Sequence, residues 1–409
     1  MYCPILLCDA NSFFASCHIA LNPGLADQPL VVGGDPKRRH GIVLAANYIA
    51  KLEYGIKTGM GVWEARERLG DRGVFVAPQH HIYVDFSLRV LRVARRFTDR
   101  IEPFSIDEFW ADVSNTGAIH KTDSAGEIAR RLQRDILRET GIPTSIGVSA
   151  NKLLAKQAAG MKKPLGITVL EPREVPERLW PLPVRELFGV GPRLEKRLRV
   201  LNIHSIGDLA NYPEQILKKR FGLIGLVLRN SANGLDYSPV NPLSLEEVKS
   251  IGHQLTLPWD YRGYEDIQTV ILELSEIVAR RVRVGGYAGR TVGLTLKDTD
   301  FKWLRRTQSL PWPTDFSESI YETAVRLLHR HWPEWRPVRM VGVTLANLIK
   351  RESEQMDLFG RTEKQRRLVE AVDRIKDRFG EQSILKGVSL TGAGVVFANR
   401  WGDDGGEPS

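Results

Sequence analysis

The chain has 409 residues, of which 42% are hydrophobic and 26% charged, and 58 Lys and Arg against 49 Asp and Glu give a formal net charge of +9. This composition excludes a disordered, collagenous or coiled-coil chain, and the length suggests roughly two to four globular domains. No apolar stretch approaches the roughly 18 residues of a membrane span, so no membrane association is expected. A basic surface without a basic tail suits a polyanion held along a groove, although an ordinary solvated surface gives the same count.

The N-terminal segment is expected to be a buried strand and not a signal peptide. Its apolar run Pro4–Cys8 has no basic residue before it and reaches an acid at Asp9, unlike a secretory leader. The three cysteines, Cys3, Cys8 and Cys17, lie too close together for a disulfide framework. We interpret them as reduced core residues of a cytoplasmic protein, with metal binding by the cysteines as the less favoured alternative.

The first 165 residues alternate strand-like and helix-like segments, which predicts an α/β or α+β layer with helices on one face. Strands are expected within residues 4–8, 29–33, 106–113, 143–148 and 166–170, and helices within residues 12–21, 89–97, 123–137 and 151–159. The segment 106–113 alternates along its length and is expected to be a half-buried strand.

Pro181 and Pro183 mark the next boundary in the chain. From there to about residue 233, short helical segments punctuated by glycines predict a small all-α domain. Residues 236–249 contain two prolines and show neither a helical nor a strand period of apolar residues, which is typical of a linker. The stretch from residue 250 to about 348 is expected to form an α+β domain with long helices at 267–284 and 316–331.

Three carboxylates are candidate catalytic residues. Asp9 ends an apolar run, where an acid needs a charged partner. Asp107 and Glu108 are adjacent in another strand, and both reach one site only if the chain turns beside Asp107. Carboxylates without clustered His or Cys favour a hard cation such as Mg²⁺ over zinc. From these residues alone, solvated acids at strand ends remain the alternative.

Several short motifs follow one another along the chain. They are Asp9–Ala15, Leu21–Pro23, Pro29–Gly33, Ala46–Tyr48, Tyr54–Met60, Ser105–Glu108, and the stretch from Ser149–Lys152 through Met161–Pro164. In this order they closely resemble the Y-family translesion DNA polymerases, the polymerase IV and V group, and the resemblance runs from residue 2 to about residue 400. It implies an α+β multidomain fold: a right-hand polymerase with a ferredoxin-like palm, small fingers, a helix-hairpin-helix thumb and a Y-family little-finger domain.

The resemblance also implies where each domain lies. The palm would comprise residues 1–10 and 76–170, the fingers 11–75, the thumb 171–235, the linker 236–249, the little finger 250–349 and a C-terminal extension 350–409. The implied activity is template-directed DNA synthesis across damaged bases by a DNA-directed DNA polymerase of low processivity and low fidelity. No part of the chain is left over for an exonuclease. A role in DNA repair and in the mutagenic SOS response follows from the same resemblance.

By that resemblance, Asp9, Asp107 and Glu108 hold two Mg²⁺ ions together with the backbone carbonyl of Ala10. One ion would lower the pKa of the primer 3′-hydroxyl, and the other would bind the triphosphate and the leaving pyrophosphate. The implied substrates are primer-template DNA and deoxynucleoside triphosphates.

The nucleotide-binding residues implied by the family motifs are Phe13, Phe14, Tyr48, Lys51 and Lys163. Phe14 matches the steric gate, whose ring fills the space of a ribose 2′-hydroxyl; an ordinary core phenylalanine is the alternative. The chain departs from the family pattern at three positions. These are Asn11 in place of a second acid, Ala45 in place of a hydroxyl residue, and Lys51 in place of an arginine. Lys51 keeps the charge and loses the bidentate geometry. Together the three departures are expected to weaken nucleotide binding, but none of them removes a metal ligand.

Two groups of residues are predicted to hold DNA. Gly189, Gly191 and Arg193 form the hairpin of a helix-hairpin-helix, in which free N–H groups at a helix start receive a phosphate. A plain helix-loop-helix is the alternative. In the little finger, the basic residues Arg281, Arg283 and Arg290 are predicted to contact backbone phosphates independently of sequence.

Gln355, Leu358 and Phe359 resemble the peptide by which bacterial polymerases bind the β sliding clamp. The two apolar side chains stand in a highly charged run, which favours a partner's pocket over solvent; packing onto the chain's own domain is the alternative. A monomer is expected. Two other functions remain open: a Y-family relative that has lost catalysis and acts as a clamp-bound adaptor, and a nucleotide cyclase, which shares a palm with paired acids.

Overall fold

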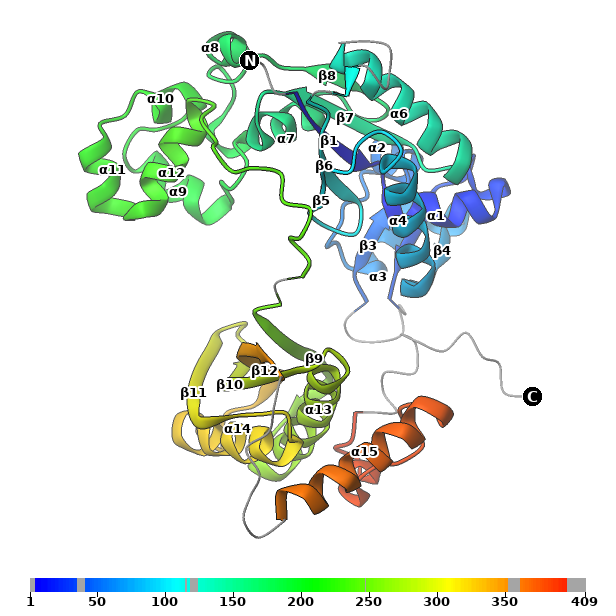
Figure 1. The fold of residues 1–409 in the computed structure, drawn as a ribbon, viewed down its shortest axis with the longest axis vertical. Coiled ribbons are helices and arrows are strands. Elements are labelled where there is room, and N and C mark those ends of the chain that lie inside the picture. The colour runs from blue at the N-terminus through cyan, green and yellow to red at the C-terminus, as the bar shows by residue number, and fades with distance from the viewer. Residues whose placement is uncertain are drawn as a thin grey trace. The chain divides into compact units, whose positions relative to one another are not determined.

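The computed structural model describes residues 4–34, 41–114, 116–117, 124–246, 248–351 and 361–395. The chain divides into two compact units, the first comprising residues 1–34 and 42–246 and the second residues 35–41 and 247–409 (Figure 1). Each unit has its own hydrophobic core. In the part of the chain that is described, no helix combines the length and the apolar character that a membrane crossing requires.

The first unit is built on a five-stranded sheet. Its strands, in spatial order, are β5 (Ile101–Pro103), β6 (Glu108–Asp112), β1 (Ile5–Ala10), β7 (Thr144–Ser149) and β8 (Ile167–Val169). The strand β1 is antiparallel to both β6 and β7. With α4 (His80–Ala94) between β1 and β5, and α6 (Ala125–Thr140) between β6 and β7, the chain has the β-α-β-β-α-β order of a ferredoxin-like fold. The predicted fold class is therefore confirmed.

Both faces of this sheet are covered, which corrects the expectation of helices on one face only. Leu6 and Cys8 of β1 pack into the core that contains α4 and α6. Ile5 and Leu7 point the other way and pack against Ala155 of α7 (Lys152–Met161). For the same reason β6 is not half-buried: all four residues from Phe109 to Asp112 are buried. The predicted strand is also shorter, because residues 105–107 form a bend before it.

A smaller sheet lies between β1 and α4 in the sequence. Its strands are β3 (Val43–Ala46), β2 (Leu30–Gly33) and β4 (Val74–Val76), and the helices around it are α1 (Phe13–Leu21), α2 (Tyr48–Tyr54) and α3 (Val62–Leu69). The side chain of Asn47 caps α2 by accepting a hydrogen bond from the N–H of Ala50. It also accepts from the N–H of Leu30, which fixes the start of α2 beside β2.

Short helices follow the five-stranded sheet. They are α8 (Val175–Arg178), α9 (Pro192–Arg199), α10 (Ile206–Ala210), α11 (Glu214–Phe221) and α12 (Leu223–Ala232), with single 3-10 turns between them. Buried leucine and isoleucine side chains from these helices form their own core. Residues 236–246 contain no regular helix or strand, as the proline-containing linker predicted.

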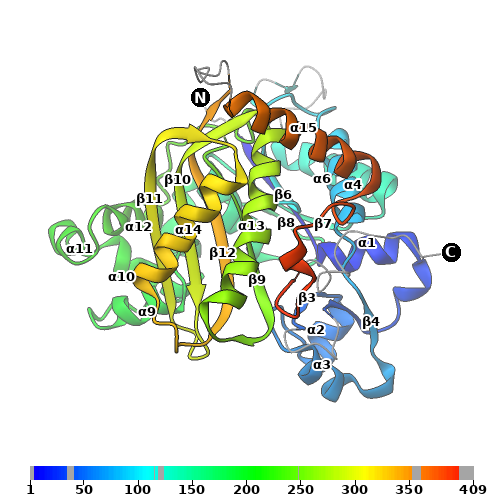
Figure 2. The ribbon, with the colours of Figure 1, turned by 90° about the horizontal axis from the view of Figure 1, so that it is seen from below.

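The second unit is an antiparallel sheet covered by helices. Its strands, in spatial order, are β11 (Trp303–Thr314), β10 (Tyr287–Lys297), β12 (Val338–Lys350) and β9 (Ser250–Tyr261). The long helices α13 (Tyr264–Val284) and α14 (Ser317–His331) lie side by side against one face of this sheet (Figure 2).

The C-terminal part of the second unit packs onto its helices. The helix α15 (Arg361–Phe379) is held by a bidentate pair between Arg366 and Asp315, at 2.7 and 2.8 Å. After a 3-10 turn at Gly387–Leu390, Ala393 and Val395 join the domain core. The C-terminal extension is therefore an integral part of this unit over its described residues.

Candidate active site

Strand pairing places two of the predicted carboxylates opposite each other. Asp9 near the end of β1 is the direct Cα partner of Glu108 at the start of β6. Side chains alternate between the two faces of the sheet, so Asp9 lies on the same face as Leu7, and Glu108 on the same face as Trp110. This is the sheet face that α7 covers. Asp9 is only 7% exposed, and a buried carboxylate needs a compensating charge.

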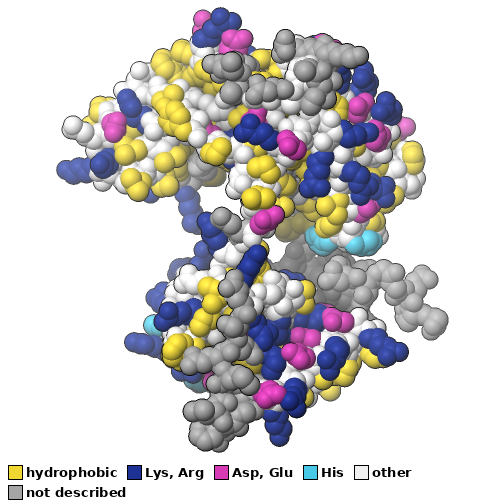
Figure 3. Space-filling model, in the orientation of Figure 1, with side chains coloured by type: hydrophobic (Ala, Val, Ile, Leu, Met, Phe, Trp, Pro, Cys, Tyr) yellow, Lys and Arg dark blue, Asp and Glu magenta, His cyan; other side chains and the backbone are white. Residues whose placement is uncertain are grey.

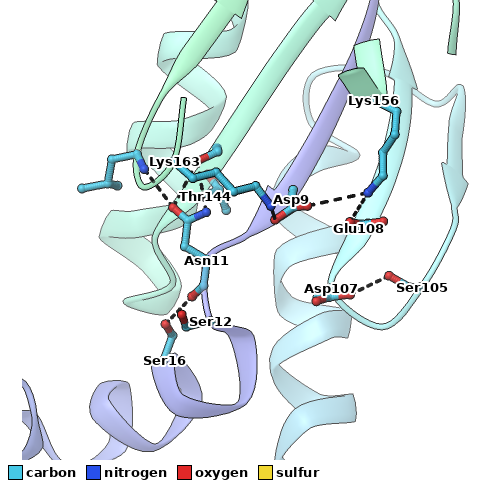
Figure 4. Close-up of polar contacts among 12 residues, drawn as sticks. Asp9, Asn11, Ser12, Ser16, Ser105, Asp107, Glu108, Thr144, Lys156 and Lys163 are labelled. Carbon is cyan, nitrogen blue, oxygen red and sulfur yellow. Dashed lines mark hydrogen bonds and ion pairs between the residues drawn. The ribbon is translucent and has the colours of Figure 1, made fainter. Parts of the chain in front are cut away.

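The turn expected beside Asp107 is present. The N–H groups of Phe104 and Ser105 both donate to the Glu108 carbonyl oxygen, at 2.9 and 3.2 Å, which closes the loop between β5 and β6. The N–H of Ala10 donates to the carbonyl oxygen of Asp107 at 2.9 Å, so the backbone of Asp107 adjoins the end of β1. Its carboxylate, however, accepts a hydrogen bond from the Ser105 hydroxyl at 2.5 Å (Figure 4). Asp107 reaches Asp9 and Glu108 only after its side chain rotates.

Two lysines neutralise the carboxylate pair. The ammonium of Lys163 lies 2.6 Å from Asp9 Oδ1. Lys156 on α7 contacts Glu108 Oε1 and lies 3.8 Å from Asp9 Oδ2 (Figure 4). The sequence reasoning identified Lys163 and missed Lys156. The available signal was a lone lysine within a mostly apolar run of this helix, Leu153–Ala159, where a cation needs an acidic partner.

The electrostatics of the pair explain why cations gather there. Burial and the facing Asp9 carboxylate raise the pKa of Glu108 to about 7, while Lys156 acts in the opposite direction. Two carboxylates in one partly buried site repel each other unless positive charge is supplied. The site therefore has the charge to attract a divalent cation.

The donor set is consistent with a hard metal ion, although the side chains are not gathered around one. Within the described ranges, no group of three or more His, Cys, Asp or Glu side chains lies close enough to hold a metal. Asp9 and Glu108 offer carboxylate oxygens without sulfur or imidazole, the donor type that Mg²⁺ prefers. Asp9 and Glu108 fit such an ion, because the ammonium groups of Lys163 and Lys156 already lie where a metal ion would supply positive charge.

The predicted triphosphate-binding residues lie together on one side of Asp9. Lys51 on α2 donates to the Ser12 hydroxyl at 2.7 Å, and its ammonium lies 5.1 Å from the centre of the Tyr48 ring. Burial and the nearby Lys163 both lower the pKa of Lys51. Two ammonium groups that destabilise each other are a suitable environment for a polyphosphate.

Asn11, which departs from the family pattern, has a structural role here. Its amide donates to the Ser145 hydroxyl at 3.0 Å, and its Oδ1 accepts from the N–H of Leu165 at 2.9 Å. Asn11 is only 1% exposed. It therefore fastens the turn that carries Lys163 to the ends of β1 and β7 (Figure 4).

The predicted steric gate is held by a second aromatic ring. Phe14 stacks on Tyr83 of α4, with ring centres 3.9 Å apart and an interplanar angle of 8°. Tyr83 is fully buried, and its hydroxyl lies 2.9 Å from His18 Nε2. Phe13 is itself buried in the core, so only Phe14 of this pair is half-exposed.

The predicted DNA hairpin has the backbone geometry of an anion site. Gly189 has φ +93°, a conformation that favours glycine, and Gly191 precedes α9. Among the described residues, the N–H groups of Gly189, Gly191 and Arg193 make no intramolecular hydrogen bond. They are exposed and free to bind a phosphate.

The little-finger arginines differ in their surroundings. Arg281 and Arg290 are exposed on the second unit, where Arg290 donates to the carbonyl of Leu310. Arg283 is instead bonded through two nitrogens to Asp373 of α15, at 2.7 and 2.9 Å. This arrangement does not favour the DNA contact predicted for Arg283. Lys and Arg side chains are otherwise spread over the visible surface of both units (Figure 3).

The predicted clamp-binding residues Gln355, Leu358 and Phe359 lie outside the described residues.

Comparison with known proteins identifies the family. The profile of the impB/mucB/samB family matches residues 8–160, that of its C-terminal domain residues 248–358, and that of its helix-hairpin-helix motif residues 172–203. A DNA polymerase IV of Pelotomaculum thermopropionicum is 60% identical over 396 residues, covering 97% of this chain and 98% of that protein. The chain belongs to the Y-family of translesion DNA polymerases. As a member of this family it is a DNA-directed DNA polymerase.

Other relatives agree with this assignment. A DNA polymerase IV of Moorella thermoacetica is 58% identical, over 97% of this chain and 98% of that protein. DNA polymerase IV 2 of Bacillus subtilis is 40% identical over 96% of both. Among solved structures, a chimera of the Y-family polymerases Dbh and Dpo4 superposes with a TM-score of 0.73 at 29% identity, covering 85% of this chain and 99% of that one.

Proposed function

We propose that this Y-family polymerase extends a primer across damaged template bases by metal-dependent nucleotidyl transfer, with low processivity and low fidelity. The observation that carries the proposal is the buried pair of Asp9 and Glu108, with Lys163 on the side where the triphosphate would lie. The proposed cofactor is a pair of Mg²⁺ ions, held by Asp9, Glu108, the rotated Asp107 and the carbonyl of Ala10. When bound, these ions would activate the primer hydroxyl and neutralise the triphosphate.

The chain's own residues would position the reactants. Lys163, Lys51 and Tyr48, the first residue of α2, would bind the phosphate oxygens of the incoming nucleotide. Phosphoryl transfer depends mainly on positioning and on charge stabilisation, so these contacts would account for much of the catalysis. Phe14, fixed by Tyr83, would exclude a ribose 2′-hydroxyl beside the sugar.

The proposed partners follow from the remaining surfaces. Primer-template DNA would be bound by the free N–H groups of the hairpin at Gly189 and Gly191 and by exposed arginines of the second unit. A solved insertion ternary complex of Dbh DNA polymerase, similar to this chain at 28% identity and a TM-score of 0.60, supports this proposal. We propose the five-stranded sheet as palm, the smaller sheet as fingers, the short helices as thumb and the second unit as little finger.

The experiment is primer extension with Mg²⁺ on undamaged and lesion-containing templates. The wild-type enzyme is expected to insert nucleotides opposite the lesion and to continue past it. Lys163→Met should raise the KM for deoxynucleotides by about tenfold, because a charge-assisted hydrogen bond is worth about 1.5–3 kcal/mol. The matched control is Lys162→Met, which removes an exposed lysine directly after α7. Equal KM values for the two variants, or no extension by the wild type, would contradict the proposal.

A further inference from the structure

Lys156 is a feature of the site that neither the predicted site residues nor the proposed mechanism uses. Its side chain is only 17% exposed, and its ammonium contacts Glu108 and approaches Asp9 to 3.8 Å. A lysine bound directly to Glu108 occupies the position of positive charge that a metal ion would take. Because the ammonium and a divalent cation repel each other, they would compete for that oxygen.

The ammonium has a second set of neighbours on its other side. The rings of Phe104 and Phe188 have their centres 5.8 and 5.9 Å from Lys156 Nζ, and the two rings lie 6.1 Å apart. Aromatic faces attract a cation at this distance. The rings give the ammonium a place to remain when it no longer contacts Glu108.

The backbone of α7 cannot move away to relieve this competition. A Cβ at Gly147 of β7 would lie 2.0 Å from the carbonyl oxygen of Ala155, so helix and sheet are packed as closely as two backbones allow. The indole N–H of Trp110 donates to the carbonyl of Lys152 at 3.0 Å on the same face. The helix is therefore anchored to the sheet, and the flexible side chain of Lys156 is the part expected to move.

We propose that Lys156 is a built-in counterion that competes with the divalent cation for Asp9 and Glu108. It stabilises the carboxylate pair in the metal-free enzyme. On metal binding its ammonium leaves Glu108 and remains between Phe104 and Phe188. The inference rests on the proposed function, because it takes Asp9 and Glu108 as metal ligands.

The test is the affinity of the enzyme for Mn²⁺ without DNA or nucleotide, measured from the electron paramagnetic resonance signal of free Mn²⁺. Lys156→Met removes the competing charge and should bind Mn²⁺ about tenfold more tightly than the wild type. Lys156→Arg retains the charge and should bind within about twofold of the wild type. The control is Lys162→Met, an equal change of charge at an exposed position after the same helix, which should also stay near the wild type. Lys156→Gln replaces the Met variant if that protein does not fold, with the same expected tightening.

Equal or weaker Mn²⁺ binding by the neutral variants at position 156 would overturn the inference. Tightening by Lys162→Met to the same extent would overturn it as well, because it would show a general effect of net charge. Glu108→Gln separates this inference from the proposed function. If Glu108→Gln binds Mn²⁺ like the wild type, the proposed metal site is wrong. If it loses Mn²⁺ while Lys156→Met matches the wild type, only the counterion is wrong.

Discussion

Phe14 is the residue that we propose to set the choice between ribonucleotides and deoxynucleotides. Its ring cannot turn away easily, because it stacks on Tyr83, which is buried and bonded through its hydroxyl to the N–H of Gln79 at 3.1 Å. Burial also raises the pKa of Tyr83 to about 12, so this phenol stays neutral over the working range of the enzyme. A rigid ring next to a sugar discriminates by steric exclusion.

Phe14→Ala should therefore admit ribonucleotides. The expected result is a rise of more than about tenfold in the ratio of ribonucleotide to deoxynucleotide insertion, or about 1.4 kcal/mol, with deoxynucleotide insertion largely retained. Single-nucleotide insertion kinetics give this ratio. The control is Tyr83→Phe, which keeps the stacked ring and loses only the hydroxyl contacts to His18 and to the N–H of Gln79. A wild-type ratio in Phe14→Ala would show that Phe14 is a core residue and not a gate.

Most of the candidate site was predicted from the family resemblance, because residue types alone left solvated acids as the alternative, and the fold explains what that prediction omitted. Asp9, Lys51 and Lys163 lie together as the family motifs imply. Lys156 could not be assigned from the sequence, because its acidic partner Glu108 lies 48 positions away and meets it only across the packing of α7 on the sheet. Asn11 was expected to weaken nucleotide binding, and that effect stays a prediction.

At the scale of elements, the position of α7 depends on the small residues beneath it. A side chain at Gly147 would meet both the carbonyl oxygen of Ala155 at 2.0 Å and the N–H of Ala159 at 2.4 Å. These are backbone atoms, which cannot rotate away. The helix that carries Lys156 is thus held at a fixed height above β1 and β7.

Gly147→Ala should displace α7 and lower stability by about 3 kcal/mol, since added volume in a packed core costs roughly 1–3 kcal/mol or more. Polymerase activity should fall with it, because Lys156 and the Lys163 turn move with the helix. Thermal unfolding of the two proteins measures the effect. Gly160→Ala, on α7 itself, is the control. A Cβ at Gly160 meets nothing within 4 Å, so the stability of this variant should be unchanged or higher by up to about 1 kcal/mol. Similar melting temperatures for both variants would contradict this account of the packing.

Some element boundaries followed from the sequence and others did not. Residues 267–284 were predicted as a helix from their apolar spacing, and α13 spans Tyr264–Val284. The helix predicted at 89–97 begins earlier, at His80, and its first turns bury Tyr83 and Phe86. The strand β6 was predicted to be half-buried, but its second face is covered by α7, which comes later in the chain.

At the scale of the whole chain, the described C-terminal residues belong to the second unit. Arg366 forms a bidentate pair with Asp315, and the hydroxyl of Tyr261 donates to the carbonyl of Ala393 at 3.1 Å. The predicted clamp-binding peptide lies between two elements of this unit: β12 ends at Lys350 and α15 begins at Arg361. An internal peptide of this kind can bind a partner while the chain on both sides stays in the domain.

We expect the double variant Leu358→Ala with Phe359→Ala to synthesise DNA normally alone but to lose stimulation by a loaded sliding clamp. Burial of each side chain in a partner contributes about 1.5–3 kcal/mol, so the peptide should bind weakly, with a Kd no tighter than on the order of micromolar. Tethering would then raise the concentration of polymerase at the primer end. Primer extension with and without clamp measures the effect, with Leu368→Ala, an exposed leucine of α15, as the control. Full stimulation of the double variant would mean that the motif only packs on the chain itself.

The central claim is that Asp9, Asp107 and Glu108 form the metal-dependent catalytic centre of this polymerase, although Asp107 is turned toward Ser105 in the structure. The most direct measurement compares Asp107→Ala with the wild type in two assays, primer-template binding and primer extension with Mg²⁺. The account predicts near-normal DNA affinity for the variant, because the hairpin at Gly189 and Gly191 is unchanged, and no detectable extension. Extension at the wild-type rate by Asp107→Ala would contradict it.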